Sequence, residues 1–352
     1  MTSSSKLTWF RRAALFAAVL CSIVVVVGAW VRLTDAGLGC PDWPGCYGVA
    51  HPAQLIEKAE QVNAAFPERP FDYQKALHEM VHRYIATLLG LVIIGLAVFS
   101  YVNRRDPEQP RVLPWVLLVL VCVQGMLGAF TVTWLLKPLI VTLHLIGGLS
   151  TLALIWWLAL PPQKRSVKAA ERPVRRLAIA GLAVLACQIV LGGWTSTNYA
   201  AVACPDFPKC QGSWWPEQDY GSAFDPWHGL GIDYEFGVLE NPARVAIHYT
   251  HRVGAVVTAA VLGLLAFAAW RRAQTGAVRV AAAAVLAALV LQWAIGVNLI
   301  WQGFPLWLGT GHNAGAAILL LAVVALIRYL WPLERLAERS AAPALRPSRA
   351  AA

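Results

Sequence analysis

Charged residues are scarce in this sequence, and the scarcity argues against an ordinary soluble domain. Asp, Glu, Lys and Arg make up 14% of the 352 residues, whereas hydrophobic residues make up 58%. Soluble domains carry about 25% charged residues, so the bilayer is the expected solvent. Acidic residues are the scarcer sign, which leaves a formal net charge of +10. Because the positive charge lies in short segments between apolar runs, it indicates membrane orientation rather than nucleic-acid binding.

Eight apolar segments are long enough to cross a bilayer, which takes roughly 20 mostly apolar residues. A cleaved signal peptide is not favoured for the first segment, because it lacks a clear small-residue cleavage site and further spans follow. The sequence predicts spanning helices at about 13–31, 78–102, 112–134, 138–160, 177–196, 245–270, 278–300 and 310–331.

Lys and Arg gather on one side of these spans and predict the topology. They are concentrated in the two tails and in the short connections 103–111, 161–176 and 271–279. Cytoplasmic segments carry the excess of Lys and Arg, so both termini are expected in the cytoplasm. The two long loops, about 32–77 and 197–244, are then expected on the outer side.

An internal repeat is the most informative feature of the chain. Two cysteine motifs, two His-Arg dipeptides and two sets of Gln, Gly and His recur in one order and at nearly one spacing. The matches are Cys40-Pro-Asp-Trp-Pro-Gly-Cys46 with Cys204-Pro-Asp-Phe-Pro-Lys-Cys210, His82-Arg83 with His251-Arg252, Gln124 and Gly128 with Gln292 and Gly296, and His144 and Gly147 with His312 and Gly315. Each half holds an even number of spans, so both halves have the same membrane orientation.

The repeat predicts an all-α integral membrane fold in which eight transmembrane helices form two pseudo-symmetric four-helix bundles. The bundles are expected at 13–160 and 177–331, joined by a cytoplasmic linker at 161–176. A cytoplasmic tail at 1–12 precedes them. The tail at 332–352 is rich in Ala, Pro, Arg and Ser, which predicts disorder.

Four histidines are the leading candidates for cofactor ligands. Ionisable groups inside a membrane are costly and usually functional, although a neutral His bonded to a neighbouring helix is the structural alternative. His82 and His144 fall near the outer ends of two helices of the same direction, and His251 with His312 repeats that placement. Two imidazoles facing each other at one depth can ligate both axial positions of a heme iron.

Residues next to these histidines fit a flat cofactor. Gly147, Gly148 and Gly315 lie about one turn further along, where glycine leaves room for a macrocycle near the backbone. Arg83 and Arg252 are candidate partners for heme propionates, although an Arg near a helix end also reaches the interface without such a role.

A zinc protease is the main competing hypothesis from the motifs. The segment His78-Glu79-Met80-Val81-His82 matches H-E-x-x-H, in which two His bind zinc and the Glu is the general base. The second half reads His248-Tyr249-Thr250-His251 instead, and no acidic third ligand is evident in a later span. Glu79 has no acidic counterpart in the second half, so it either bonds an outer loop or serves chemistry unique to the first half. His78 and His248 receive no assignment.

The outer-loop cysteines favour two local disulfides, Cys40–Cys46 and Cys204–Cys210. Close cysteine pairs on an oxidising side form disulfides. A four-thiolate zinc site from both loops is the alternative, although the usual C-x₂₋₄-C spacing is absent.

Taken together, these motifs resemble the heme A synthase family, in its cysteine-containing bacterial type. The resemblance covers about 13–331 and rests on Glu79-x-x-His82-Arg83, His144, His251-Arg252, His312, the eight spans and the paired-cysteine loops. It implies a heme-dependent oxidoreductase of the bacterial plasma membrane that converts the C8 methyl group of heme O to the formyl group of heme A for cytochrome oxidase. It also implies a resident heme b on His251 and His312, a substrate heme on His82 and His144, and Glu79 as the catalytic acid.

The same resemblance implies partners. Heme O is the expected substrate, and heme O synthase and cytochrome oxidase assembly factors are expected neighbours in the lipid membrane; no nucleic acid is expected. The alternative function is that of a bis-histidine cytochrome b, which transfers electrons without converting a heme substrate. A transporter is a third class, but the sequence shows no pair of broken helices to support it.

Overall fold

The computed structural model describes residues 3–163 and 171–331, and the chain is helical throughout its ordered elements. Within these ranges there is no β-strand, only two isolated bridges in the loops. The predicted disorder of 332–352 lies outside the described residues, as do residues 1–2 and residues 164–170 of the predicted linker. The all-α prediction is therefore confirmed for the part of the chain that is described.

Eight long apolar helices confirm the predicted spans. They are α1 (Ser3–Leu33), α3 (Tyr73–Val102), α4 (Leu113–Thr133), α5 (Pro138–Ala159), α6 (Arg172–Thr197), α8 (Asn241–Arg271), α9 (Gly276–Trp301) and α10 (Leu306–Leu330). Short elements occupy the long loops: η1 (Pro52–Lys58), α2 (Ala59–Ala65), η3 (Ala201–Ala203) and α7 (Tyr220–Ala223).

Several helices begin earlier than hydropathy predicts, because a polar cap or a proline in the first turn starts them before the apolar run. The side chain of Asp72 accepts hydrogen bonds from the backbone N–H groups of Gln74 (2.9 Å) and Lys75 (3.1 Å), so α3 begins at Tyr73. Proline lies in the first turn of α5, α6 and α8. Its fixed backbone angle suits a helix, and a backbone N–H at that position would have no partner within the helix.

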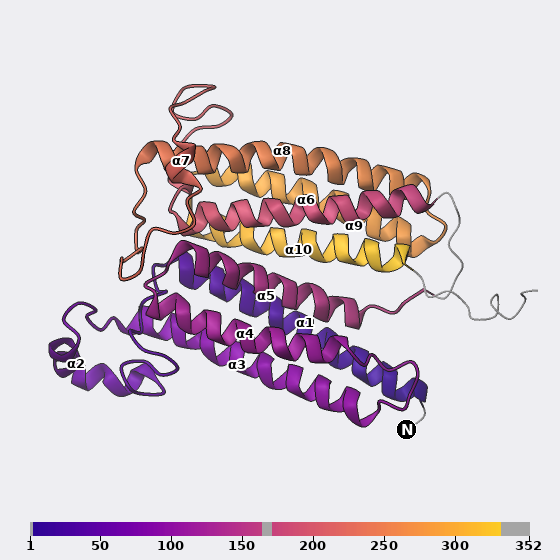
Figure 1. Cartoon of the computed structure of the whole chain (residues 1–352), viewed down its shortest axis with the longest axis horizontal. Coiled ribbons are helices and arrows are strands. Elements are labelled where there is room, and N and C mark those ends of the chain that lie inside the picture. The colour runs from indigo at the N-terminus through magenta and orange to yellow at the C-terminus, as the bar shows by residue number, and fades with distance from the viewer. Residues whose placement is uncertain (1–2, 164–170, 332–352) are drawn as a thin grey trace, which may run out of the picture.

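The helices pack in two groups that meet along one side (Figure 1). Within the first group α1 contacts α3 and α5, and α4 contacts the same two helices; α6, α8, α9 and α10 form the same ring of contacts. Between the groups, α10 contacts α1 and α5, and α5 contacts α6. One hydrophobic core runs through both groups, from Phe10 and Leu152 to Leu265 and Val323. The exact domain bounds of the two halves stay a prediction.

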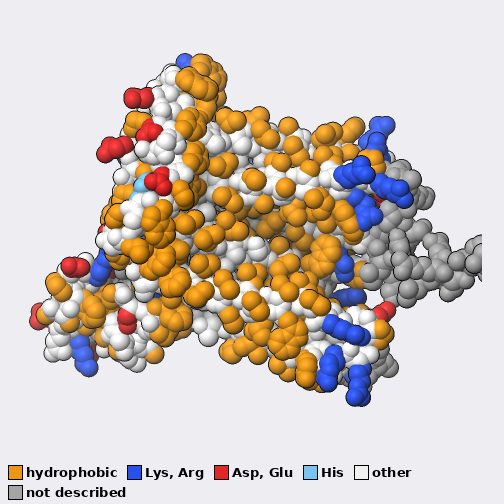
Figure 2. Space-filling view, in the orientation of Figure 1, with side chains coloured by type: hydrophobic (Ala, Val, Ile, Leu, Met, Phe, Trp, Pro, Cys, Tyr) orange, Lys and Arg blue, Asp and Glu red, His pale blue; other side chains and the backbone are white. Residues whose placement is uncertain are grey.

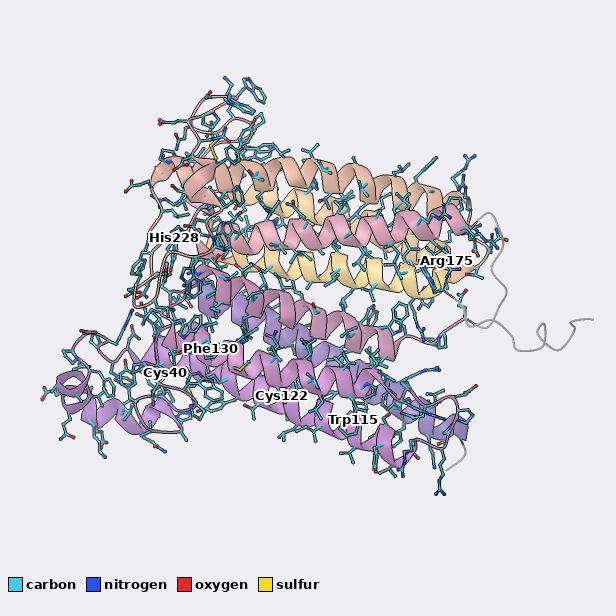
Figure 3. The ribbon with its side chains drawn as sticks, viewed as in Figure 1. Cys40, Trp115, Cys122, Phe130, Arg175 and His228 are labelled. Atoms are coloured by element: carbon cyan, nitrogen blue, oxygen red, sulfur yellow. A yellow bond between two sulfur atoms is a disulfide. The ribbon has the colours of Figure 1, made fainter. Side chains whose placement is uncertain are left out.

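The two ends of the helices differ in charge and in chain length. Lys and Arg gather at one end, here called the basic end, while the long loops with most visible Asp and Glu lie at the other, here called the loop end (Figure 2). Arg175 marks the basic end, and Cys40 and His228 lie at the loop end (Figure 3). Large apolar side chains such as Leu91, Val119 and Phe267 are exposed between the ends. This distribution suits a membrane span, while the side on which the termini lie stays a prediction.

Candidate functional site

Each of the four candidate histidines lies against a glycine on the helix that precedes it in the chain. A Cβ atom placed on that glycine would lie 2.9–3.1 Å from the imidazole Cε1 atom at three of the four sites, so the ring would have to shift there, whereas 3.5 Å at Gly128 is ordinary contact. The pairs are Gly28 of α1 with His82 of α3 (2.9 Å), Gly128 of α4 with His144 of α5 (3.5 Å), Gly192 of α6 with His251 of α8 (3.1 Å), and Gly296 of α9 with His312 of α10 (2.9 Å).

The histidines also come together in the predicted pairs. The ring centroids of His251 and His312 are 6.4 Å apart, with planes inclined by 82°. His82 and His144 lie close enough to interact electrostatically. Both pairs therefore bring imidazoles from two helices into one space inside each helix group.

The chemistry of these side chains fits two hemes with paired histidine ligands. Among the described residues, the buried Nδ1 atoms of His82, His144 and His312 have no hydrogen-bond partner. A buried polar atom without a partner costs about 1–3 kcal/mol, and Nδ1 of His248, which is not a candidate ligand, is unpartnered as well. A heme iron would be held by the other ring nitrogen, Nε2, of each candidate histidine, so the fit rests on imidazoles paired across helices rather than on these Nδ1 atoms. The role of the candidate histidines as iron ligands stays a prediction.

The expectation that Gly147 and Gly315 leave room for a macrocycle is wrong for these two positions. Glutamine amides occupy that space: a Cβ on Gly147 would lie 1.6 Å from Gln124 Nε2, and one on Gly315 would lie 2.2 Å from Gln292 Oε1. The repeat of Gln with Gly in the sequence therefore records a direct contact between neighbouring helices. Only Gly148 of the three keeps an open side, with no atom within 4 Å of the added Cβ.

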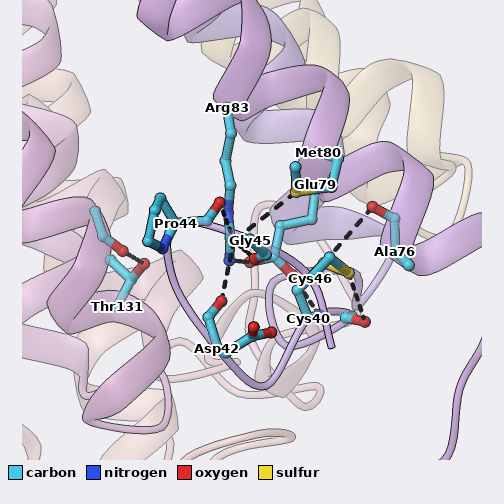
Figure 4. A network of polar contacts seen from close by, with 12 residues as sticks. Cys40, Asp42, Pro44, Gly45, Cys46, Ala76, Glu79, Met80, Arg83 and Thr131 are labelled. Atoms are coloured by element: carbon cyan, nitrogen blue, oxygen red, sulfur yellow. Dashed lines mark hydrogen bonds and ion pairs between the residues drawn. A yellow bond between two sulfur atoms is a disulfide. The ribbon is translucent and has the colours of Figure 1, made fainter. Parts of the chain in front are cut away.

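Glu79 is buried at the loop end and ties α3 to the first disulfide loop (Figure 4). Its carboxylate accepts a hydrogen bond from the backbone N–H of Cys40 at 2.8 Å and forms an ion pair with Arg83, one turn along the helix. The Arg83 guanidinium also donates to the carbonyl oxygens of Asp42 (3.0 Å) and Pro44 (3.2 Å). Glu79, Arg83 and the first disulfide loop thus form one hydrogen-bonded network beside His82.

His248 takes the place of Glu79 in the second half, which sequence reasoning missed. The Arg252 guanidinium lies 3.2 Å from His248 Nε2 and donates to the carbonyl oxygens of Lys209 (2.8 Å) and Cys204 (2.9 Å). The same four-residue step separates Glu79 from Arg83 and His248 from Arg252. The signal was present in the sequence, since His248 precedes His251 by the same three residues that separate Glu79 from His82.

Both arginines therefore bind loop carbonyls in the same way. Their contact with heme propionates stays a prediction. The contacts that the structure shows give both arginines a structural role, which is to hold the disulfide loops against the helices. Arginine suits this role because its planar guanidinium presents several donors in a fixed fork.

The two cysteine loops have closely similar structures. Cys40–Cys46 and Cys204–Cys210 are disulfides with S–S distances of 2.04 and 1.97 Å, so the four-thiolate alternative does not form. Asp42 accepts hydrogen bonds from the backbone of Tyr47 and Gly48, and Asp206 from that of Gln211 and Gly212. Burial alone would raise the pKa of Asp206, but these amide donors outweigh it and hold that pKa below its usual range.

The H-E-x-x-H segment does not gather a zinc-binding set. The ring of His78 lies edge-on to Trp30, 6.2 Å between centroids, while Glu79 is engaged by Arg83. In the ranges that the structure describes, no three His, Cys, Asp or Glu side chains come together as metal ligands. The geometry therefore favours the paired-histidine interpretation.

A family model described as cytochrome oxidase assembly protein matches residues 11–324, nearly the whole chain. The chain belongs to this family. It is 40% identical over 329 residues to the heme A synthase of Shewanella oneidensis, covering 93% of this chain and 97% of that protein. It is 30% identical to the heme A synthase of Caulobacter vibrioides, covering 95% of this chain and 100% of that protein. The resemblance inferred from the motifs is confirmed.

Sequence reasoning also missed residues that repeat between helices rather than between halves. Gln188 and Gly192 on α6 repeat the spacing of Gln124 and Gly128, and Gly254 on α8 follows His251 as Gly147 follows His144. A search for Q-x₃-G in one span followed by H-x₂-G in the next would have found them.

Proposed function

We propose that this chain is a heme A synthase, which oxidises the C8 methyl group of heme O to the formyl group of heme A for cytochrome oxidase. The observation that carries the proposal is a pair of equivalent histidine sites of which, among the residues that the structure describes, only the first has a buried carboxylate beside it. Full-length similarity to curated heme A synthases supports the same conclusion.

The two halves divide the work. His82 and His144 bind the substrate heme O in the first half, next to Glu79. His251 and His312 hold a resident heme b in the second half, where His248 replaces the acid. Heme b supplies one-electron transfer when it is bound. A site for chemistry and a site for electron transfer have different needs, which accounts for the exchange of Glu for His at otherwise matching positions.

Glu79 is the residue that this division makes catalytic. It lies one turn from His82 on α3, so both side chains reach the same region of the first half. Its carboxylate is buried and held by Arg83 and the Cys40 amide, so its oxygens are fixed in position. A carboxylate oriented in this way can hold or transfer a proton beside the substrate methyl group, which typically contributes 10²–10⁴-fold to a rate.

The proposal includes the setting of the enzyme. The loop end with its disulfides faces the oxidising outer side of a bacterial plasma membrane, and both termini lie in the cytoplasm. Heme O synthase and cytochrome oxidase assembly factors are the expected neighbours that deliver the substrate and accept the product.

Turnover of heme O tests the proposal. Purified chain in lipid nanodiscs is given heme O, a reductant and oxygen, and extracted hemes are identified by mass. Heme A is the expected product. A protein that binds heme in both halves, transfers electrons and never forms heme A or a hydroxylated heme O would be an electron-transfer cytochrome b instead.

Glu79→Gln is the variant that tests the catalytic role. We expect heme A formation to fall by about 100-fold or more, with the spectrum of the second-half heme unchanged. His248→Gln, at the matching position of the second half, is the control and should retain most of the activity. Full activity of Glu79→Gln would contradict the assignment.

A further inference from the structure

The four histidine sites are alike in their glycines but differ in a glutamine. Gln188 of α6 reaches across to α8, where its Nε2 donates to the backbone carbonyl of His251 at 2.9 Å and lies 3.0 Å from the ring Nδ1. Its other amide atom fills the notch at Gly254, where an added Cβ would lie 2.3 Å from Gln188 Oε1. One amide thus contacts both the ring and the backbone of the histidine.

Gln292 makes similar backbone and notch contacts around the second histidine of that half, but its amide lies against the other ring nitrogen. Its Nε2 donates to the backbone carbonyl of His312 at 3.1 Å and lies 3.4 Å from the ring Nε2, while Oε1 fills the notch at Gly315. Both histidines of the second half are therefore fixed by a glutamine from the preceding helix.

Gln124 occupies the corresponding notch beside His144 in the first half. Its amide nitrogen lies closest to the position of a Cβ on Gly147, at 1.6 Å. The buried Nε2 of Gln124 and the buried Nδ1 of His144 have no hydrogen-bond partner among the described residues. The glutamine is in place at this histidine, with its amide group turned differently.

His82 is the exception. Val24 stands one turn before Gly28 on α1, where the other three sites have glutamine one turn before the glycine. Ile85 stands three residues after His82, where the other sites have the glycine that forms the notch. Both halves of the contact are thus replaced together, by two apolar side chains that cannot hydrogen-bond an imidazole.

We propose that Gln188 and Gln292 are positioning residues for the two heme-ligating histidines of the second half, that Gln124 stands in the matching notch beside His144, and that His82, which has no such glutamine, is the exchangeable ligand that lets the substrate heme enter and leave. The proposal rests on the assignment of the first half to substrate and the second to cofactor. A resident heme needs two fixed ligands, whereas a substrate heme that is replaced at every turnover needs one ligand that can dissociate from the iron. Residues that orient a metal-binding histidine typically contribute 10–100-fold to affinity.

Loss of heme from each half to an excess of apomyoglobin measures this directly. Gln188→Leu and Gln292→Leu should speed heme loss from the second half by about tenfold or more and change the electron paramagnetic resonance g-values of that heme, which report the orientation of the imidazoles. Asn298→Leu is the matched control, because it removes an exposed amide from the same helix as Gln292 without touching a histidine.

The converse variant transfers the missing contact to His82. Val24→Gln combined with Ile85→Gly should slow heme loss from the first half by about tenfold, whereas Ile85→Gly alone should not. If the combined variant does not fold, the Gln188→Leu and Gln292→Leu results decide the matter, since unchanged heme loss and unchanged g-values there would overturn the proposal. Wild-type turnover of heme O, measured in parallel, separates this failure from a failure of the proposed function.

Discussion

At the scale of single residues, glycine decides whether a histidine can stand between two packed helices. Gly28, Gly192 and Gly296 each face an imidazole at a distance that a methyl group would make too short, whereas a methyl group at Gly128 would make an ordinary contact. A side chain at any of the first three positions would displace the ring by several tenths of an ångström or more. In the proposed heme sites a bond between histidine and iron would tolerate little displacement, so we expect these glycines to matter for the cofactor more than for the fold.

Gly296→Ala tests this contact, since its Cβ would lie 2.9 Å from His312 Cε1. We expect reduced heme content in the second half and a shifted midpoint potential, measured by pyridine hemochrome assay and redox titration. Gly263→Ala in α8 is the control, because nothing lies within 4 Å of its added Cβ; it should keep its heme and, from helix propensity, gain up to about 1 kcal/mol of stability. Equal heme content in both variants would contradict the role given to Gly296.

At the scale of elements, the repeating unit is a pair of consecutive spanning helices rather than half of the chain. The first helix of each pair supplies the glycine, and the second helix supplies the histidine. Three of the four pairs add the glutamine. The sequence comparison of halves found Gln124 with Gln292 but not Gln188, because the first half has Val24 at the position that corresponds to Gln188.

The helices themselves were predictable, since length and apolar character suffice for a span. Their ends were less so: capping by Asp72 starts α3 five residues before the apolar run predicted at 78. A bond from Glu79 to an outer loop was one of two alternatives drawn from the sequence, and the structure shows this bond at Cys40. The contacts of Arg83 could not be predicted, because they depend on which loop carbonyls it reaches. The sequence comparison did identify Glu79 as the feature that breaks the symmetry of the halves.

The arginines beside the histidines connect helix and loop, and a variant tests their role. Arg252→Lys keeps the charge but cannot bond Lys209, Cys204 and His248 together, because a single ammonium group lacks the planar fork. We expect the Cys204–Cys210 disulfide to become more accessible to a water-soluble phosphine, with reduction several-fold faster by thiol labelling and mass analysis.

Reduction of Cys40–Cys46 in the same sample is the internal control and should keep its wild-type rate. Arg83→Lys should reverse the pattern. If neither variant changes the reduction of its own loop, the arginines do not hold the loops and the propionate hypothesis becomes the better account of them.

At the scale of the whole molecule, the long loop of the second half closes over the first. Its crossover segment, residues 225–237, lies on the connection between α4 and α5. The backbone N–H of Tyr234 donates to the carbonyl of Leu135 at 3.1 Å, and buried Lys137 donates to the carbonyl of Gly229 at 2.6 Å. Arg69 of the first long loop forms ion pairs with Asp233 and Glu235. No pattern in the sequence predicted this contact, because it joins loops from different halves.

Lys137 is the centre of that contact, and its replacement tests whether the crossover segment protects the first half. Its ammonium nitrogen lies 3.0 Å from the centroid of the Trp227 ring as well as bonding Gly229. Lys137→Met keeps the length of the side chain but removes its hydrogen bond to Gly229, whose carbonyl still accepts from the Tyr234 hydroxyl, and it removes the cation–π contact. This should destabilise the docked segment by about 1–3 kcal/mol.

We therefore expect proteolysis of Lys137→Met within 225–237 to be about tenfold faster, since about 1.4 kcal/mol corresponds to tenfold in the open population. We also expect faster heme loss from the first half and unchanged loss from the second. Trp214→Leu changes an exposed side chain of the same loop and should match the wild type in both measurements. Faster cleavage with unchanged heme loss would mean that the segment docks on the first half without closing it, whereas unchanged cleavage would show that Lys137 does not hold it.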